Sequence, residues 1–239
     1  MERIEYVIND LAEWLKRKVE EAGAKGLVFG LSGGIDSAVM GGISKLAFPD
    51  TSLGIIMPCY SPEIDKEHAL LVADSLNLDT KTVDLDSVFD KLLKIAGLGL
   101  DNKLAIANIK PRLRMTTLYY FAQNYNYLVA GPSNKSEFIT GYFTKYGDSG
   151  VDLLPLADFI KTEIWEIAKY LNIPQVIIEK EPTAGLWEDQ TDENEMGFSY
   201  KLLDHYIVTG KGPEKVVNKI NAMYKASRHK RGFPPIYSR

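Results

Sequence analysis

Residues 28–38 read VFGLSGGIDSA, a short apolar run followed at once by a serine, two glycines, an aspartate and a second serine. The apolar run is typical of a buried strand, and the residues after it continue as a helix. A strand, a glycine-rich turn and a helix form the arrangement in which backbone N–H groups at the helix N-terminus bind phosphate, assisted by the helix dipole. This stretch therefore predicts a phosphate-binding loop at the end of a first strand.

Each polar or small residue of the loop suits that task. Gly33 and Gly34 allow an anion to approach the backbone, because neither carries a β-carbon that would collide with it. Ser32 and Ser37 add hydroxyl donors, and the carboxylate of Asp36 can bind a metal ion. A Walker loop would need a lysine before its Ser/Thr, and a dinucleotide loop would need G-x-G-x-x-G, so this is a different phosphate loop.

The remaining pattern predicts the fold around the loop. Apolar runs bounded by turn residues recur along the chain, and longer helical patterns separate them. This alternation predicts an α/β fold with a doubly wound, mainly parallel sheet flanked by helices, of the Rossmann-like type. The expected strands are KGLVFGLS (25–32), TSLGIIMP (51–58), TKTVDL (80–85) and NYLVAG (126–131).

Helix signals complete this outline. An amphipathic N-terminal helix is expected from the spacing of its apolar residues, and the Ser61-Pro62-Glu63 sequence predicts a helix over 62–76. Pro111 is tolerated in a first helical turn, which predicts a helix that begins close to Asn108. Further helices are expected near 134–139, from about Phe159 to a stop before Pro174, and as a pair near the C-terminus, the second opened by Gly212-Pro213.

Composition limits the function. The chain has 239 residues, of which 45% are hydrophobic, so we expect one domain over 1–239. The net charge of -4 disfavours nucleic acid or an anionic membrane as partners. Cys59 is the single cysteine, so neither a disulfide framework nor a multi-cysteine zinc site can form within the chain. Without a signal peptide or an apolar span, we expect a cytoplasmic protein.

Two segments lack a regular period. Residues 179–198, EKEPTAGLWEDQTDENEMGF, are polar, acidic and too long for an ordinary connection, which predicts a functional loop. The chain closes with SRHKRGFPPIYSR, a basic, proline-bearing tail in which no helix is expected.

Several stretches of the sequence resemble those of a known family. SGGIDS resembles the pyrophosphate-binding loop of the N-type ATP pyrophosphatases, which split ATP into AMP and pyrophosphate and share the adenine nucleotide alpha hydrolase-like fold. Two later stretches resemble ammonia-dependent NAD synthetase. The first is GPSNKSEFITGYFTKYGDSG together with the residues up to Pro174, and the second is EPTAGLWEDQTDE. With IKPRLRM and RHKRGFPP, the resemblance covers nearly the whole chain in order.

The resemblance implies a ligase that forms a C–N bond in the last step of NAD biosynthesis. The carboxylate of deamido-NAD (nicotinic acid adenine dinucleotide) attacks the α-phosphorus of ATP, pyrophosphate leaves, and ammonia displaces AMP from the acyl-adenylate. No glutaminase domain is expected, because the synthetase pattern takes up the chain. Free ammonium and a separate glutaminase remain alternative sources of ammonia.

The resemblance also implies the site residues. Asp36, Glu137 and Lys161 are the implied catalytic residues, with Asp36 and Glu137 as ligands of Mg²⁺. The implied contacts to ATP, the co-substrate, are Gly30, Leu31, Ser32, Gly33, Gly34, Ile35, Asp36, Ser37, Pro132, Lys161 and Thr183. Pro132 departs from the threonine that is usual there, and proline has neither a hydroxyl nor an N–H. Whether Pro132 or Ser133 replaces this contact stays open.

Deamido-NAD carries a carboxylate and a pyrophosphate, so its site needs local cations despite the acidic chain. The resemblance assigns this substrate Arg112, Lys145, Asp152, His229 and Lys230. It further implies a homodimer with the acceptor site at the subunit interface. The aromatic segment TTLYYFAQNY (116–125) is a candidate for the apolar face of that interface.

Two other interpretations keep the phosphate loop. An RNA-modifying relative would generally need paired cysteines, an added RNA-binding domain or a basic groove, whereas this chain has one cysteine and a charge of -4. A regulatory nucleotide-binding protein would not require Glu137, Lys161 and the substrate cations together. Formation of AMP and pyrophosphate from ATP, Mg²⁺, ammonium and deamido-NAD separates the three interpretations.

Overall fold

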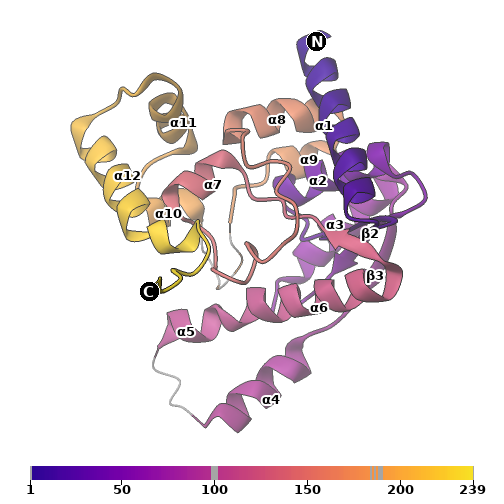
Figure 1. Ribbon diagram of the computed structural model, residues 1–239. Helices are drawn as coiled ribbons and strands as arrows, with labels where there is room; N and C mark the ends of the chain where they lie inside the picture. Colours follow the sequence, from indigo (N-terminus) through magenta and orange to yellow (C-terminus); the bar gives the residue numbers. More distant parts are fainter. Residues whose placement is uncertain (1, 98–101, 184, 186, 188–190, 239) are drawn as a thin grey trace.

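The computed structural model describes residues 2–97, 102–183, 185, 187 and 191–238, and its centre is a parallel sheet (Figure 1). The sheet has the order β3-β2-β1-β4 and all its pairs are parallel. Its strands are β1 (Gly26–Gly30), β2 (Ser52–Ile56), β3 (Asp79–Thr82) and β4 (Tyr127–Val129). The first strand therefore lies inside the sheet, and the phosphate loop leaves its carboxyl end.

The strands bury both faces because alternate side chains point to opposite sides of the sheet. Leu27 and Phe29 of β1 belong to one apolar cluster and Val28 belongs to the other. The first cluster takes its helical residues from α1 (Glu2–Glu21), α2 (Ile35–Ala47), α3 (Glu63–Leu76), α8 (Lys161–Tyr170) and α9 (Gln175–Ile178). The second takes them mainly from α4 (Asp86–Ala96) and α6 (Ile109–Tyr125).

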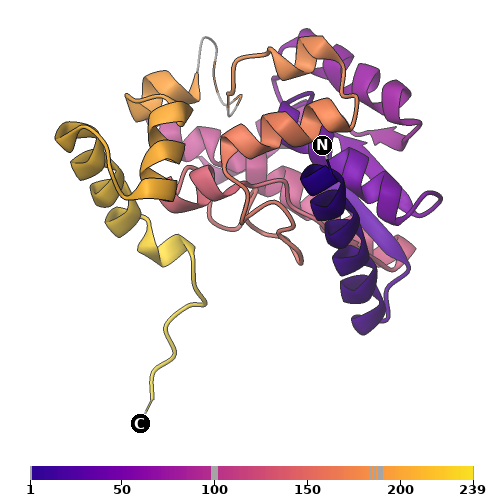
Figure 2. The ribbon, with the colours of Figure 1, turned by 90° about the horizontal axis from the view of Figure 1, so that it is seen from above.

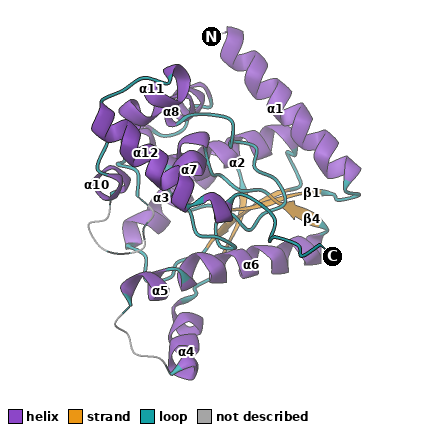
Figure 3. Ribbon diagram, turned by 60° about the vertical axis from the view of Figure 1, so that its left-hand side comes forward, coloured by secondary structure: helices purple, strands orange, loops and turns teal. Residues whose placement is uncertain are grey.

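Helices on both faces of a parallel sheet confirm the predicted α/β, doubly wound architecture, and Figure 3 shows the strands between the helical layers. Helix α3 starts at Glu63, one residue after the expected position, and α6 starts at Ile109 with Asn108 as its N-cap. Pro111 then lies in the first turn of α6, where its missing N–H removes no helical bond.

Some expected boundaries were wrong. Strand β3 ends at Thr82, although the Val83 N–H still donates to the Ile56 carbonyl of β2 at 2.8 Å before α4 begins at Asp86. Helix α8 begins at Lys161, so Phe159 and Ile160 precede it. The short elements α5 (Lys103–Ala107), α9 and α10 (Asp192–Met196) were not expected, nor were α4 and the 3-10 turn η1 (Arg228–Lys230) in the basic tail.

The C-terminal helices form a smaller layer beside the main body (Figures 1 and 2). Helices α10, α11 (Tyr200–Thr209) and α12 (Glu214–Ala226) have their own apolar cluster around Tyr200, Leu203 and Ile220. After η1 the chain runs away from this layer in an extended course, which Figure 2 shows most clearly. In the described ranges, no helix combines the length and apolar character needed to cross a bilayer.

Candidate active site

The phosphate loop is held by a small set of hydrogen bonds. The Ser37 hydroxyl accepts from the Ser32 N–H at 3.2 Å and donates to the Gly34 carbonyl at 2.8 Å. Gly33 has φ +76°, and a β-carbon there would lie 2.3 Å from the carbonyl oxygen of Asp65. Only glycine fits this position, because both the backbone conformation and the close approach of α3 exclude a side chain.

A cavity of about 440 Å³ opens beside this loop at the carboxyl edge of the sheet. Ligands of open α/β sheets bind in this place, outside the carboxyl ends of the strands. All the predicted ATP contacts except Gly33 line the cavity, and so does Glu137. Pro132 and Ser133 both line it, and Ser133 is buried. Thr183 also lines it, from the segment that follows α9.

Three charged side chains from three helices meet on one wall. Lys161 is 1% exposed, and its ammonium forms an ion pair with Asp36 and lies 3.8 Å from Glu137 Oε1. Asp36 is in the first turn of α2, Lys161 begins α8, and Glu137 is in the first turn of α7 (Lys135–Thr140). The predicted catalytic trio is therefore assembled, although its members are far apart in the sequence.

Asn134 explains why α7 begins where it does. Its side chain accepts from the Glu137 N–H at 3.0 Å, and Glu137 Oε2 accepts from the Asn134 N–H at 3.4 Å, which makes a capping box. The amide nitrogen of the same side chain donates to Asp36 Oδ1 at 2.8 Å. Asn134 thus connects the helix start that holds Glu137 to the carboxylate on α2.

Asp192 is a fourth charged member that sequence reasoning missed. It is 4% exposed, lines the cavity, and one carboxylate oxygen accepts from the Tyr200 hydroxyl at 2.8 Å. The other oxygen, Oδ1, is buried and has no hydrogen-bond partner among the described residues. A helix start at Thr191-Asp192, with Thr191 as N-cap, was the available signal, but the acidic segment around it concealed the short helix.

The side chains of this wall carry an excess of negative charge, which favours binding of a cation. Three carboxylates face one ammonium, so two negative charges are left uncompensated when all four groups are ionised. Burial and the neighbouring Asp36 raise the pKa of Glu137 well above its usual value. Burial alone would lower the pKa of Lys161, but Asp36 and Glu137 outweigh burial and raise it, so the lysine stays protonated.

A divalent cation such as Mg²⁺ fits this wall. Hard carboxylate oxygens are available on Asp36 and Glu137, and the partnerless oxygen of Asp192 adds to the same negative field. Mg²⁺ usually takes one or two carboxylates and completes its shell with water and substrate phosphate.

The raised pKa of Glu137 has a consequence for stability. A group with a raised pKa in the folded state stabilises the fold at low pH, and that contribution is lost as the pH rises through the folded pKa. Glu137→Gln is therefore expected to raise the melting temperature of the ligand-free protein by about 2–5 °C at neutral pH. Thermal unfolding from about pH 5 to about pH 8 checks this, because the difference from wild type should grow with pH.

Glu166→Gln, on an exposed turn of α8, is the matched control and should leave the melting temperature unchanged. A Glu137→Gln protein that melts below wild type at all these pH values would contradict the charge imbalance.

The residues predicted for deamido-NAD are more dispersed. Lys230 lines the cavity, and its ammonium donates to the carbonyls of Gly141 at 2.8 Å and Phe143 at 2.7 Å. The guanidinium of Arg112 donates to the backbone carbonyl of Lys145 at 3.3 Å, which connects α6 to the loop that carries Lys145. His229 is exposed.

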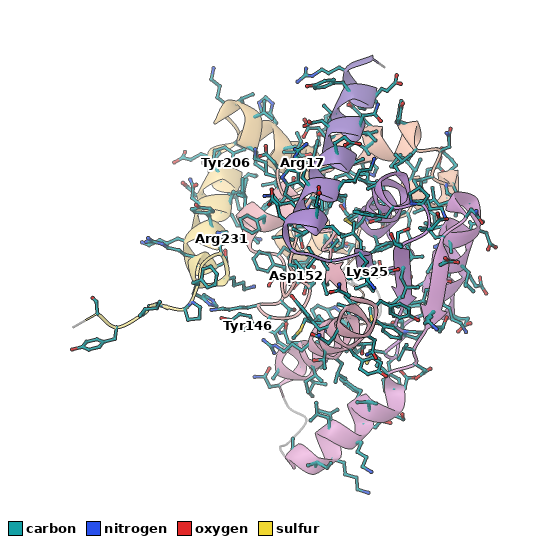
Figure 4. The ribbon with its side chains drawn as sticks, turned by 45° about the vertical axis from the view of Figure 1, so that its right-hand side comes forward. Arg17, Lys25, Tyr146, Asp152, Tyr206 and Arg231 are labelled. Atoms are coloured by element: carbon teal, nitrogen blue, oxygen red, sulfur yellow. The ribbon has the colours of Figure 1, made fainter. Side chains whose placement is uncertain are left out.

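Asp152 is anchored at the edge of the sheet. Its carboxylate accepts from the Val129 N–H at 2.8 Å and from the Tyr119 hydroxyl at 3.0 Å. Figure 4 labels Asp152 and Tyr146 on the loop between α7 and α8, and Arg231 on the basic tail. The guanidinium of Arg231 donates to the Phe138 carbonyl at 3.2 Å, so the tail is attached to α7.

The parallel sheet carries a phosphate loop after its first strand, and a buried lysine lies between two carboxylates beside that loop. These features are those of the nucleotide-binding α/β enzymes. The sequence model of the NAD synthase family matches residues 7–234. The chain belongs to this family.

Individual relatives agree with that assignment. An NH(3)-dependent NAD(+) synthetase of Carboxydothermus hydrogenoformans is 55% identical over 229 residues, covering 95% of this chain and 94% of that protein. An NMN synthetase of Francisella tularensis superposes with a TM-score of 0.94 at 34% identity over 98% of both chains. An NH3-dependent NAD synthetase of Campylobacter jejuni, solved with nitrate, gives a TM-score of 0.82 at 28% identity over 98% of this chain and 99% of that one.

Proposed function

We propose that the protein uses ATP to amidate deamido-NAD with ammonia, yielding NAD, AMP and pyrophosphate. The observation that carries this proposal is the position of the Asp36–Lys161–Glu137 wall beside the phosphate loop, in a cavity large enough for substrates. Relatives named for this reaction cover nearly the whole chain. We further propose that residues 1–239 act as one catalytic unit in the cytoplasm.

The loop and the wall would share the work of the first step. The backbone N–H groups of the loop and the Ser32 and Ser37 hydroxyls would bind the departing pyrophosphate. Lys161 would stabilise negative charge that develops at the α-phosphate, since an ammonium in a buried site interacts strongly with an anion. Asp36 and Glu137 would hold Mg²⁺, which neutralises charge on the phosphates when it is bound.

The second step is a displacement at the acyl carbon. Ammonium first loses a proton to solvent to give ammonia. Ammonia then attacks the carbonyl carbon of the acyl-adenylate, the new C–N bond forms, the bond to the AMP oxygen breaks, and the nitrogen releases one further proton to solvent. AMP leaves with the oxygen that came from the substrate carboxylate. Exclusion of water from the cavity would protect the acyl-adenylate from hydrolysis until ammonia arrives.

A product assay tests this function directly. Incubation with ATP, Mg²⁺, ammonium and deamido-NAD should give NAD, AMP and pyrophosphate in equal amounts. AMP and pyrophosphate released without any NAD would contradict it, and so would the absence of turnover.

A second substrate is favoured by one comparison. The Francisella tularensis protein with the TM-score of 0.94 is named an NMN synthetase, whose reaction would correspond to amidation of the mononucleotide rather than the dinucleotide. Parallel kcat/KM measurements with nicotinic acid mononucleotide and deamido-NAD distinguish the two. We propose the dinucleotide as the preferred substrate, because the relative with 55% identity is named for NAD.

We also propose a homodimer. Tyr120 and Tyr125 on α6 are 65% and 41% exposed, and Ile95 on the neighbouring α4 is 73% exposed, so apolar surface is available on this side. Light scattering at assay concentration should give twice the mass of one chain.

Ammonia would reach the site as free ammonium or from a separate glutaminase, and only the second source would require another binding surface.

The proposed acceptor role of Lys145 leads to a kinetic prediction. Lys145→Ala should raise KM for deamido-NAD about tenfold and leave KM for ATP within about twofold, because a charged hydrogen bond to one substrate is lost. The Lys145 ammonium lies 5.1 Å from the Tyr146 ring, and Lys219 lies 6.0 Å from the Phe198 ring elsewhere in the protein. Lys219→Ala is thus a matched control that should change neither KM. Equal increases of both KM values in Lys145→Ala would count against the assignment.

A further inference from the structure

A lysine outside the predicted site lies against the phosphate loop. Lys180 follows the short helix α9, whose residues Ile177 and Ile178 are buried in the main apolar cluster. The burial of these two isoleucines fixes the position of the backbone at Lys180. Its ammonium is 2.7 Å from Asp65 Oδ1 and donates to the Gly33 carbonyl at 3.4 Å. Lys180 therefore joins the loop to the first turn of α3.

Each of the other cations that line the cavity is engaged with partners other than the loop backbone. Lys66 pairs with Glu63 on the first turn of α3 at 3.2 Å. Lys161 is paired with the carboxylates of Asp36 and Glu137, and Lys230 is bonded to two carbonyls near α7. Arg114 donates to the Met57 carbonyl and the Ser61 hydroxyl. Among the cavity-lining lysines and arginines of the described chain, Lys180 is the one whose side chain donates a hydrogen bond to the backbone of the phosphate loop.

The carboxylate of Asp65 lies where it would oppose binding of an anion, and Lys180 neutralises it. The carbonyl of Asp65 packs against Gly33, so its carboxylate belongs to the same wall as the proposed pyrophosphate position. An unpaired carboxylate there would repel phosphate, and a paired one would not. The Lys180–Asp65 pair is only about one-fifth exposed, at 20% and 21% of the side chains, which limits screening by solvent.

We infer that Lys180 is a direct ligand of the leaving pyrophosphate, held over the loop by Asp65 until the nucleotide arrives. This role rests on the proposed function. The ammonium has three donors, and a pyrophosphate oxygen can replace the long contact to the Gly33 carbonyl while the bond to Asp65 is kept. Charge on the β- and γ-phosphates increases as the bond to the α-phosphate breaks, so the contact strengthens along the reaction.

Separate binding of the two products distinguishes this role from a structural one. Titration calorimetry with Mg²⁺ and pyrophosphate should show about 10- to 100-fold weaker binding to Lys180→Met than to wild type. AMP carries no β- or γ-phosphate, so its affinity should change less than about twofold. A lysine that only held the fold together would lower both affinities and the melting temperature.

Two further variants separate direct contact from mere neutralisation of Asp65. If Lys180 contacts pyrophosphate, Asp65→Asn should keep wild-type affinity or exceed it, and Lys180→Met with Asp65→Asn should recover only part of the loss. Full recovery in the double variant would overturn the direct contact. Lys45→Ala is the control, because Lys45 is a half-buried lysine bonded to the Pro49 carbonyl at 2.6 Å at the far end of α2.

The result also separates this inference from the proposed function. Unchanged pyrophosphate binding by Lys180→Met, in a wild-type protein that makes NAD, would overturn the role of Lys180 alone. A wild-type protein that binds no pyrophosphate would overturn both.

Discussion

Asp36→Asn is expected to lower kcat for NAD formation by about a thousandfold or more at saturating ATP and Mg²⁺. The carboxylate of Asp36 is the point where the loop, the lysine and the proposed metal meet, since it pairs with Lys161 and accepts from Asn134 at 2.8 Å. An asparagine oxygen can still accept from Asn134, so the fold should persist. It cannot supply the negative charge that binds a divalent cation.

Three measurements check this prediction: steady-state kcat, Mg²⁺ binding by calorimetry in the presence of a non-hydrolysable ATP analogue, and thermal unfolding. Asp158→Asn is the matched control. Asp158 pairs with Lys135 near the start of α7, and its side chain is 92% exposed. Its replacement should leave kcat and metal affinity at wild-type values. Asp36→Asn with wild-type turnover would refute both the metal-ligand role and the catalytic role of this residue.

Lys161→Met is expected to lower kcat by about 100- to 1,000-fold, and to destabilise the protein as well. The lysine is 1% exposed, and its removal leaves Asp36 and Glu137, whose side chains are only 18% and 17% exposed, without a counter-charge. Loss of one partner from a buried ion pair typically costs about 3–5 kcal/mol. For a chain of this length we expect the melting temperature to fall by about 10 °C.

A second substitution separates the catalytic from the structural part of that effect. Adding Glu137→Gln to Lys161→Met removes one of the two carboxylates that have lost their counter-charge. The melting temperature of the double variant should therefore be several degrees higher than that of Lys161→Met. Its activity should stay as low as that of the single variant, because the double variant lacks both the cation and one of the two proposed metal ligands. Recovery of turnover together with stability would show that Lys161 has only a structural role.

The sequence predicted the parts of the fold that depend on local chemistry. SGGIDS identified the loop, because two adjacent glycines between an apolar run and a helix have a clear physical use. Pro111 placed the start of α6 to within one residue, since proline is restricted to the first helical turn. The alternation of strands and helices was sufficient for the layered architecture.

The parts that depend on distant contacts could not be predicted in this way. Asp192 was predicted to belong to an acidic loop, and its burial arises from packing of α10 against Tyr200 in the C-terminal apolar cluster. Lys180 has no local pattern that distinguishes it from a surface lysine, and its contact to Gly33 spans 147 residues of sequence. Short helices such as α9 contain too few residues for a period to be detected.

The resemblance supplied residues that periodicity could not. Glu137 and Lys161 were assigned by their place in a family pattern, and the structure brings both to Asp36. The residues predicted for deamido-NAD are brought together less completely within one chain. The Arg112 guanidinium reaches the backbone of Lys145, whereas His229 is exposed on the basic tail.

In the proposed reaction the substrate carboxylate attacks the α-phosphorus of ATP. Deamido-NAD labelled with ¹⁸O in its nicotinate carboxylate tests this most directly, with the phosphate products analysed by mass spectrometry. The proposed mechanism predicts one labelled oxygen in AMP for each NAD formed, and no label in pyrophosphate. Label in orthophosphate or pyrophosphate, with ADP or unlabelled AMP as the nucleotide product, would contradict it.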